Sequence, residues 1–273
     1  MTLVLLSGGR DSVCLLTTLL ERGEAVEALH VNYGLRPAAD GDEAFCRALC
    51  ERLGVKLHVH RAGRPEGNVQ DWARRVRYDV AHTLTDGDIA TGHTATDQVE
   101  TVLYRLAASP GRRALLGMRE RQGRVVRPLL HLTRADTAAH CRARGLEWRV
   151  DASNADPTYA RTRVREALVP ALRTLHPAAE ANLLATLEVL RAEADVLDDL
   201  VSDALAGRDR IPAAELAALP PALRRLVFIA LAGAPVGHRV DEVLALRHGS
   251  LDLGYGRRAT VARGLVGVAS TPT

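Results

Sequence analysis

The sequence of 273 residues is almost free of lysine: Lys56 is the single one, and the remaining basic side chains apart from histidine are arginines. A Walker-type phosphate loop requires a Gly-Lys pair, but Lys56 follows Val55. A covalent enzyme lysine requires a lysine at the site. The scarcity of lysine therefore excludes a Walker-type phosphate loop and leaves Lys56 as the one candidate for a covalent enzyme lysine.

Cysteines and long apolar runs are also scarce. Four scattered cysteines are too few for a disulfide scaffold, which favours a reducing, cytoplasmic compartment. Cys46 and Cys50 have helical i, i+4 spacing but no second pair of metal ligands, so we expect them to be buried packing residues. No run of about 18 apolar residues occurs, so no membrane-spanning helix is expected. The apolar start, Met1 to Leu6, predicts a strand rather than a signal peptide.

The remaining composition is that of a folded α/β protein. A hydrophobic content of 47% is enough for one large domain and a smaller one. Short β-branched runs alternate with stretches of helical period, which predicts βαβ units around a doubly wound parallel sheet. The predicted strands are Leu3–Leu6, Val26–Val31, Val55–His60, Asp88–Thr91 and Val125–Arg127. The predicted helices are Asp11–Glu21, Asp42–Leu53, Val69–Leu84, Asp97–Ala107 and Arg134–Arg144.

The alternation stops near His176, which predicts a second, mainly helical domain. We expect a first domain over residues 1–175, a helical domain over 176–248 and a small β tail over 249–273. Helices are predicted at Ala178–Leu205 and Pro221–Leu231. In the tail, the segments Leu251–Leu253, Thr260–Arg263 and Leu265–Val268 favour a small hairpin.

The segment Ser7-Gly8-Gly9-Arg10-Asp11-Ser12 lies between the first predicted strand and helix. Its glycines allow backbone N–H groups to face an anion, the helix start adds its dipole, and two serines add hydroxyl groups. A carboxylate beside a phosphate is repulsive unless a cation lies between them, so Asp11 indicates Mg²⁺ on a polyphosphate. The alternative is an ordinary glycine-rich turn in which Asp11 caps the helix.

His93, Asp97 and Glu100 are spaced i, i+4 and i+7, which predicts one shared helix face at the same edge of the sheet. A carboxylate there binds an ammonium group and accepts the proton that the amine loses as it reacts. Asp97 and Glu100 are the candidates, with His93 orienting one of them or contacting phosphate. The alternatives are a solvated helix face and a structural histidine.

Positive charge is concentrated in Arg112–Arg173, where 14 arginines and six acidic residues give a net charge of +8, although the whole chain carries only +3. Arginine binds phosphate bidentately and stacks on bases, which favours a folded RNA partner. The candidates are Arg161, Arg163 and Arg165, and the alternative is a solvated basic surface. Arg74 shares a predicted helix face with Arg77, either toward a nucleotide or in structural ion pairs.

These motifs resemble the N-type ATP pyrophosphatase superfamily, whose hallmark is an SGGxDS loop, and within it the tRNA(Ile)-lysidine synthase family. The resemblance covers most of Thr2 to Arg173. The segments that carry it are His30–Arg36, Gly67–Asn68 with Ala73–Tyr78, Thr91–His93 with Asp97–Thr101, Arg127–Leu130, and Asp151–Asp156 followed by Arg161–Arg165.

The resemblance implies ATP and Mg²⁺ as cofactors, and the CAU-anticodon tRNA(Ile) and free L-lysine as substrates. It implies adenylation at C2 of the wobble cytidine, followed by displacement of AMP by lysine. The first domain would be catalytic and the helical domain would bind tRNA; a homodimer is compatible with the sequence. The implied catalytic residues are Asp11, His93, Asp97, Glu100 and Arg74; the ATP-binding residues are Ser7, Gly8, Gly9, Arg10, Asp11, Ser12, His30, Asn32 and Gly92; the metal ligands are Asp11 and Asp97; the RNA-binding residues are Arg161, Arg163 and Arg165.

The sequence departs from the family at two places. Ala108–Gly111 replaces a Gly-Ser-Gly run, and Tyr33 replaces a common histidine. The length is that of members without a further carboxy-terminal domain.

Three other functions stay open at this point. A tRNA 2-thiolation enzyme needs a sulfur carrier, and this chain has no CxxC motif. A glutamine-dependent ligase needs an ammonia-producing domain for which the length leaves no room. A nucleotide- or RNA-binding module without catalysis is the third alternative.

Overall fold

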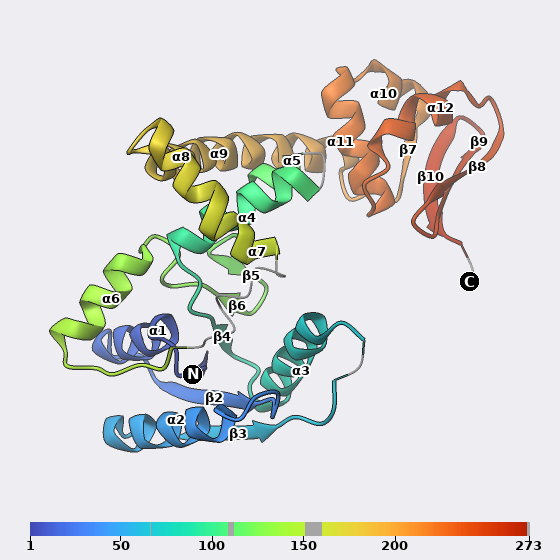
Figure 1. Ribbon diagram of the computed structural model, residues 1–273. Helices are drawn as coiled ribbons and strands as arrows, with labels where there is room; N and C mark the ends of the chain where they lie inside the picture. Colours follow the sequence, from blue (N-terminus) through green and yellow to red (C-terminus); the bar gives the residue numbers. More distant parts are fainter. Residues whose placement is uncertain (66, 109–111, 151–159, 272–273) are drawn as a thin grey trace. The chain divides into compact units, whose positions relative to one another are not determined.

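The computed structural model describes residues 1–65, 67–108, 112–150 and 160–271 (Figure 1). The chain divides into two compact units, Met1–Leu187 and Glu188–Thr273, with the boundary inside helix α9 (Ala179–Leu205). The domain division predicted from the sequence, after residues 175 and 248, stays a prediction. Within the described ranges, no helix combines the length and the apolar content needed to cross a membrane.

The first unit is built on a six-stranded sheet in the order β3-β2-β1-β4-β6-β5. All neighbouring pairs are parallel except β5 and β6. This confirms the predicted parallel α/β fold. The strands are β1 (Thr2–Leu5), β2 (Val26–Asn32), β3 (Leu57–Arg61), β4 (Asp88–Ala90), β5 (Arg121–Gln122) and β6 (Val125–Val126).

The helices of this unit follow the sequence pattern closely, since each predicted helix occurs with its ends shifted by at most three residues. Helix α5 and the helical segment after residue 160, which contains a π-helix at Val164–Leu168, were not predicted. The bounds are α1 (Arg10–Glu21), α2 (Ala39–Leu53), α3 (Val69–Leu84), α4 (Ala95–Ala108), α5 (Arg112–Leu115), α6 (Arg134–Ala143), α7 (Ala160–Arg163) and α8 (Val169–Leu175).

The alternating side chains of β1 explain why helices cover both faces of the sheet. Val4 and the following Leu6 belong to a buried cluster with residues of α1, α2 and α6. Leu3 and Leu5 belong to a second cluster with residues of α3. Because successive side chains of a strand point to opposite faces, one apolar strand anchors both layers.

The order in which strands are added to the sheet reverses at β1: β2 and β3 lie on one side of it, and β4, which follows them in sequence, pairs in parallel on the other side. In open α/β sheets, ligands bind beyond the carboxyl ends of the strands at such a switch point. The loop from Leu6 to Gly9 and the loop from Thr91 to Thr94 both begin there. The topology therefore brings the two predicted functional motifs to one edge.

The second unit combines helices with an antiparallel sheet in the order β7-β10-β9-β8. The structure extends the predicted small hairpin, because the three strands of residues 249–270 are longer than predicted and the last of them, β10, also pairs with β7. They share a buried cluster with residues of α11, including Phe228. The elements are β7 (Arg210–Pro212), α10 (Ala213–Ala218), α11 (Pro221–Ala232), α12 (Val240–Ala245), β8 (Gly249–Gly254), β9 (Arg257–Ala262) and β10 (Leu265–Ser270).

Candidate active site

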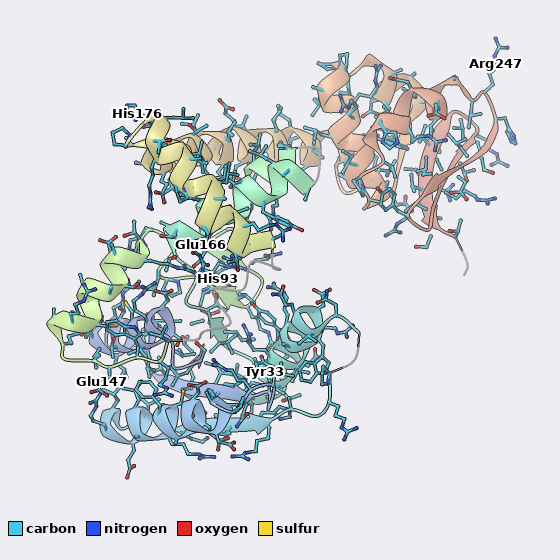
Figure 2. All side chains as sticks on the ribbon, viewed as in Figure 1. Tyr33, His93, Glu147, Glu166, His176 and Arg247 are labelled. Carbon is cyan, nitrogen blue, oxygen red and sulfur yellow. The ribbon has the colours of Figure 1, made fainter. Side chains whose placement is uncertain are left out.

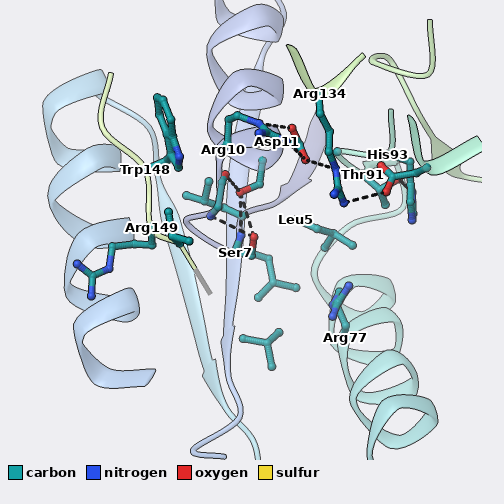
Figure 3. A pocket seen from close by; sticks show the side chains of 18 of the residues that line it. Leu5, Ser7, Arg10, Asp11, Arg77, Thr91, His93, Arg134, Trp148 and Arg149 are labelled. Atoms are coloured by element: carbon teal, nitrogen blue, oxygen red, sulfur yellow. Dashed lines mark hydrogen bonds and ion pairs between the residues drawn. The ribbon is translucent and has the colours of Figure 1, made fainter. Parts of the chain in front are cut away.

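A cavity of about 430 Å³ lies at the switch point of the first unit (Figure 3). One wall comes from the Ser7–Ser12 loop, and the opposite wall from the segment that joins β4 to α4. Apolar side chains of β1 and β2 line its floor, and Arg134 and Trp148 complete it. A mostly preformed cleft with a few convergent polar groups is the usual form of a small-molecule site.

The Ser7–Ser12 loop is held in a tight turn that requires glycine at one position. Gly8 has a φ of +82°, and a Cβ atom there would lie 3.2 Å from Phe45 and 3.3 Å from the Cys46 sulfur. Ser12 Oγ donates to the Gly9 carbonyl at 2.8 Å, which holds the start of α1 against the loop. The turn and the helix start have the form of a phosphate-binding loop.

Gly92 brings the opposite wall close to this loop. A Cβ atom at Gly92 would lie 2.9 Å from the Asp11 carbonyl oxygen, so a larger residue would push the wall away from α1. Gly92 lines the cavity, as expected for an ATP-binding residue, although the assignment stays a prediction.

The Asp11 carboxylate lies at the cavity between two donors. Arg10 Nε donates to it at 2.9 Å and Thr137 Oγ1 at 2.6 Å, and its side chain is 22% exposed. An exposed carboxylate beside a phosphate loop fits Mg²⁺ carried by a polyphosphate. No three His, Cys, Asp or Glu side chains form a ready-made metal site in the described part of the chain, so phosphate oxygens would have to complete the coordination.

His93 does not share a helix with Asp97 and Glu100, which corrects the predicted i, i+4, i+7 face. Helix α4 begins at Ala95, two residues after His93. The Asp97 carboxylate accepts from the N–H and the hydroxyl of Thr94 at 2.8 Å, and these bonds fix the start of the helix. His93 still lines the cavity, and its Nδ1 lies 2.8 Å from Thr91 Oγ1. Burial lowers the pKa of His93 to about 4, so the ring is neutral at pH 7.

Three arginines surround the two predicted amine-binding carboxylates. Glu100 is fully buried, and its oxygens accept from Arg165 at 2.7 and 3.0 Å and from Arg161 at 2.9 Å. Asp97 Oδ1 accepts from Arg161 at 2.8 Å and from Arg134 at 3.4 Å. Arg134 also lies 3.8 Å from Glu100. Asp97 lines the cavity, whereas Glu100 lies behind these guanidinium groups.

These ion pairs keep the cluster charged. Burial alone would raise the pKa of Asp97, but the charges of Arg161 and Arg134 and the Thr94 hydrogen bonds outweigh it and hold the pKa below its usual range. The hydrogen bond to Glu100 raises the pKa of Arg165. Two carboxylates and three guanidinium groups leave a local net charge of +1.

Three predicted ATP-binding residues lie outside the cavity lining: Gly8, at the turn of the loop, and two side chains, His30 and Asn32. His30 is 4% exposed, and its Nδ1 lies 2.9 Å from the Leu6 carbonyl oxygen. The Asn32 amide nitrogen donates to Asp40 and Glu43 at 3.0 Å. The His30 side chain therefore contacts the backbone that leads into the loop, and the Asn32 side chain contacts the start of α2; direct contact of either with ATP stays a prediction.

Arg77 rather than the predicted Arg74 lines the cavity. Its Nε donates to the Tyr33 hydroxyl at 3.0 Å, and Tyr33 also lines the cavity. The tyrosine that replaces the common histidine of the family therefore contributes to the site. Arg74 stacks on Tyr78, with its guanidinium carbon 5.0 Å from the ring centre. Its positive charge also contributes to the lowered pKa of His93. Figure 2 labels Tyr33 and His93 in the first unit.

The three predicted RNA-binding arginines lie on a helical segment. Arg161 and Arg165, one turn apart, both contact Glu100, while Arg163 between them is exposed. The helical period therefore turns Arg161 and Arg165 toward Glu100 and places Arg163 on an exposed side. The preceding motif, Asp151–Asp156, lies outside the described residues.

Sequence reasoning missed four residues of the site: Arg134, Thr137, Trp148 and Arg149. The Arg149 N–H donates to the Gly8 carbonyl at 2.9 Å, so its segment closes one side of the loop. A helix start after the strand next to β4 was the available signal for Arg134 and Thr137. No pattern in the sequence pointed to Trp148 and Arg149.

Comparison with known proteins gives a consistent result. Residues 1–172 match the PP-loop domain family. A tRNA(Ile)-lysidine synthase of Deinococcus radiodurans is 39% identical over 96% of this chain and 45% of its own length. One of Thermus thermophilus is 41% identical over 70% of this chain and 39% of its own length. One of Gloeobacter violaceus is 38% identical over 82% of this chain and 74% of its own length.

The chain thus spans less than half the length of the Deinococcus and Thermus relatives. Among solved structures, the U34-tRNA thiolase NcsA from Methanococcus maripaludis superposes with a TM-score of 0.57 at 16% identity, over 70% of this chain and 72% of that one. That similarity supports the fold alone. The chain therefore belongs to the PP-loop domain family and, within it, to the family of the tRNA(Ile)-lysidine synthases.

Proposed function

We propose that the chain ligates free lysine to C2 of the wobble cytidine, C34, of the CAU-anticodon tRNA(Ile), using ATP and an adenylated tRNA intermediate. The observation that carries the proposal is the shared cavity: the phosphate-type loop with Asp11 forms one wall, and Asp97 of the carboxylate pair lies on the other. The two relatives named above as lysidine synthases with the longest matches to this chain support the substrate assignment.

In the first step, the oxygen on C2 of the cytidine attacks the α-phosphorus of ATP, and the electron pair of the broken P–O bond leaves with pyrophosphate. The Ser7–Ser12 loop would hold the polyphosphate with its backbone N–H groups and hydroxyls. Mg²⁺, when bound, would neutralise developing phosphate charge. Asp11 fits the metal better than Asp97 does, since the Asp11 side chain is 22% exposed, whereas the Asp97 side chain is 9% exposed and contacts two arginines.

In the second step, the lysine amine attacks C2, a C–N bond forms, and the electron pair of the broken C–O bond leaves with AMP. Asp97 and Glu100 would bind the ammonium group and take up its proton. Because arginines already contact three of the four carboxylate oxygens, an ammonium group that binds there must displace or share a guanidinium. We infer that Arg161 or Arg165 shifts when lysine binds.

RNA binding is assigned to the arginine-rich part of the chain, including Arg161, Arg163 and Arg165. The α9 stretch from residue 188 to 205 carries six acidic residues and one arginine, so it repels phosphate. Within the predicted helical tRNA-binding domain, contacts are therefore expected outside this stretch.

The arrangement of cysteines argues against 2-thiolation. All four cysteines are buried and free, and none lines the cavity. Burial raises the pKa of Cys46 to about 12 and that of Cys50 to about 11, which suppresses the reactive thiolate.

Mass spectrometry of nucleosides tests the proposal. A tRNA(Ile) transcript with a CAU anticodon is incubated with the chain, ATP, Mg²⁺ and lysine, then digested and analysed. We expect a lysine adduct of cytidine that disappears when ATP or lysine is omitted, and that is absent from a transcript with uridine at position 34. An unmodified cytidine in the complete reaction contradicts the proposal.

A further inference from the structure

Arg134 occupies the space between the two walls of the cavity, and nothing in the sequence motifs assigns it a role. Its guanidinium lies 3.9 Å from Asp11, 3.4 Å from Asp97 and 3.8 Å from Glu100. Figure 3 shows it between the loop that carries Asp11 and the side of the cavity that carries His93. Arg134 is therefore a cation that faces both halves of the proposed site.

Its contacts are looser than those of the neighbouring arginines. Arg161 and Arg165 donate to the carboxylates at 2.7–3.0 Å, whereas the one hydrogen bond of the Arg134 guanidinium to them is 3.4 Å long. Within the described residues, Arg134 Nε is buried and has no hydrogen-bond partner. Arg134 thus retains donor capacity at the cavity, and a buried donor without a partner favours an incoming acceptor.

The base of the side chain is fixed, which allows the guanidinium to act from a defined place. Arg134 is the first residue of α6, and its backbone N–H donates to Thr96 Oγ1 at 3.1 Å. This bond ties the start of α6 to the start of α4. Thr133 and Asp136 form a capping box that secures the same turn.

We propose that Arg134 is a catalytic residue that binds a non-bridging oxygen of the α-phosphoryl group, in ATP during adenylation and in the AMP ester during attack by lysine. This inference rests on the proposed function. In the first step the cytidine oxygen forms a bond to the α-phosphorus as the bond to the β-bridging oxygen breaks, and pyrophosphate takes the electron pair. In the second step AMP takes the electron pair of the C–O bond.

The position explains why one arginine would serve both steps. The phosphate loop holds the β- and γ-phosphates on the Asp11 side, and the amine is expected on the Asp97 side, so the α-phosphate lies between them. Arg10 is engaged with Asp11 and Thr137, and Arg161 and Arg165 with the carboxylate pair. A preoriented donor at the point where charge develops is worth about 10²- to 10³-fold in rate.

Ligand binding provides a test that does not depend on turnover. Isothermal titration with AMP, which contains the α-phosphate, is compared with titration by pyrophosphate, which lacks it. Arg134→Gln is expected to weaken AMP binding about tenfold or more and to leave pyrophosphate binding within about twofold. Arg134→Lys retains the charge and should recover part of the loss. Arg144→Gln is the matched control, because Arg144 at the other end of α6 pairs with Glu21 on the surface.

Thio-substituted ATP tests the same contact during the reaction. The rates of adenylation with the Rp and Sp diastereomers of ATPαS are measured for the wild type, Arg134→Gln and Arg144→Gln. If Arg134 contacts one non-bridging oxygen, the ratio of the Rp rate to the Sp rate changes about tenfold or more in Arg134→Gln and stays unchanged in Arg144→Gln.

The results separate the inference from the function. Unchanged AMP affinity in Arg134→Gln overturns the inference, as does an unchanged diastereomer ratio, even when the wild type makes lysidine. A wild type that binds AMP through Arg134 but forms no adenylated tRNA overturns the proposed function and the catalytic role together. Thermal unfolding of each variant checks that the fold is retained.

Discussion

The two walls of the cavity differ in how exposed their carboxylates are. On the phosphate wall, the Asp11 side chain lines the cavity and is 22% exposed, although Arg10 and Thr137 donate to it. On the carboxylate wall, Glu100 is fully buried and arginines cover it and Asp97. Under the proposed function, this difference means that the ATP side is prepared before substrate arrives, whereas the amine side must first exchange ion-pair partners.

Removal of the Asp11 carboxylate is expected to have the largest effect. Asp11→Ala should lower tRNA-dependent pyrophosphate release by about 10³-fold or more, because metal stabilisation of phosphate charge is worth several kcal/mol. Binding of tRNA should change by less than about threefold, as measured by filter binding. The backbone of the loop survives the change, so ATP binding should weaken without vanishing. A rate near that of the wild type would show that Asp11 only holds Arg10 and Thr137 in place.

Glu100→Gln tests the covered wall. Loss of one charge should weaken lysine binding about tenfold or more, because an ammonium group pairs with a carboxylate far better than with an amide. It also leaves Arg165 without its main partner, so unfolding free energy should fall by about 3 kcal/mol. Denaturant unfolding and lysine titration of the adenylated complex give both quantities. Unchanged lysine affinity would remove Glu100 from the amine site.

The arginine segment offers a matched pair on one helix. Arg165→Gln should reduce stability, because its partner Glu100 is buried, whereas exposed Arg163→Gln should change stability by less than about 0.5 kcal/mol. Arg163→Gln should instead lower the magnitude of the slope of log K for tRNA against log salt by roughly 1. Equal slopes for Arg163→Gln and the wild type would mean that Arg163 contacts no phosphate.

The last expected effect is a dependence of stability on pH at His93. Its pKa of about 4 in the folded chain lies below the value near 6.5 expected after unfolding, so the unfolded chain binds more protons in between. This contribution is full above pH 6.5 and is lost as pH falls toward 4. From pH 7 to pH 5 the wild type should lose about 2 kcal/mol more than His93→Gln. Equal losses in urea titrations would mean that His93 is not desolvated.

Local patterns in the sequence were sufficient for the sheet and for the phosphate wall. The elements of the first unit have strong periodicity, and the glycines at Gly8 and Gly92 are required by a positive φ and by a close backbone approach. The capping role of Thr94 was overlooked, so the i, i+4, i+7 spacing placed His93 on the helix face of Asp97 and Glu100, although α4 begins only at Ala95.

The carboxylate wall depends on contacts between distant segments, which no local pattern encodes. Arg161 and Glu100 are 61 residues apart, and Arg165 and Glu100 are 65 residues apart. Sequence spacing identified Arg161, Arg163 and Arg165 as a group, but the helix turns only the first and last toward Glu100. The short strand β7 was missed because its pairing with β10 is likewise non-local.

Single-turnover quench with ATP labelled at the α-phosphate tests the division of the cavity into two walls most directly. Formation and decay of adenylated tRNA are followed for the wild type, Asp11→Ala and Glu100→Gln at low and saturating lysine. The account predicts that Asp11→Ala forms no intermediate, whereas Glu100→Gln forms it and accumulates it until lysine is raised. If Glu100→Gln blocks adenylation as fully as Asp11→Ala, with no dependence on lysine, both walls serve ATP and the assignment of an amine side is contradicted.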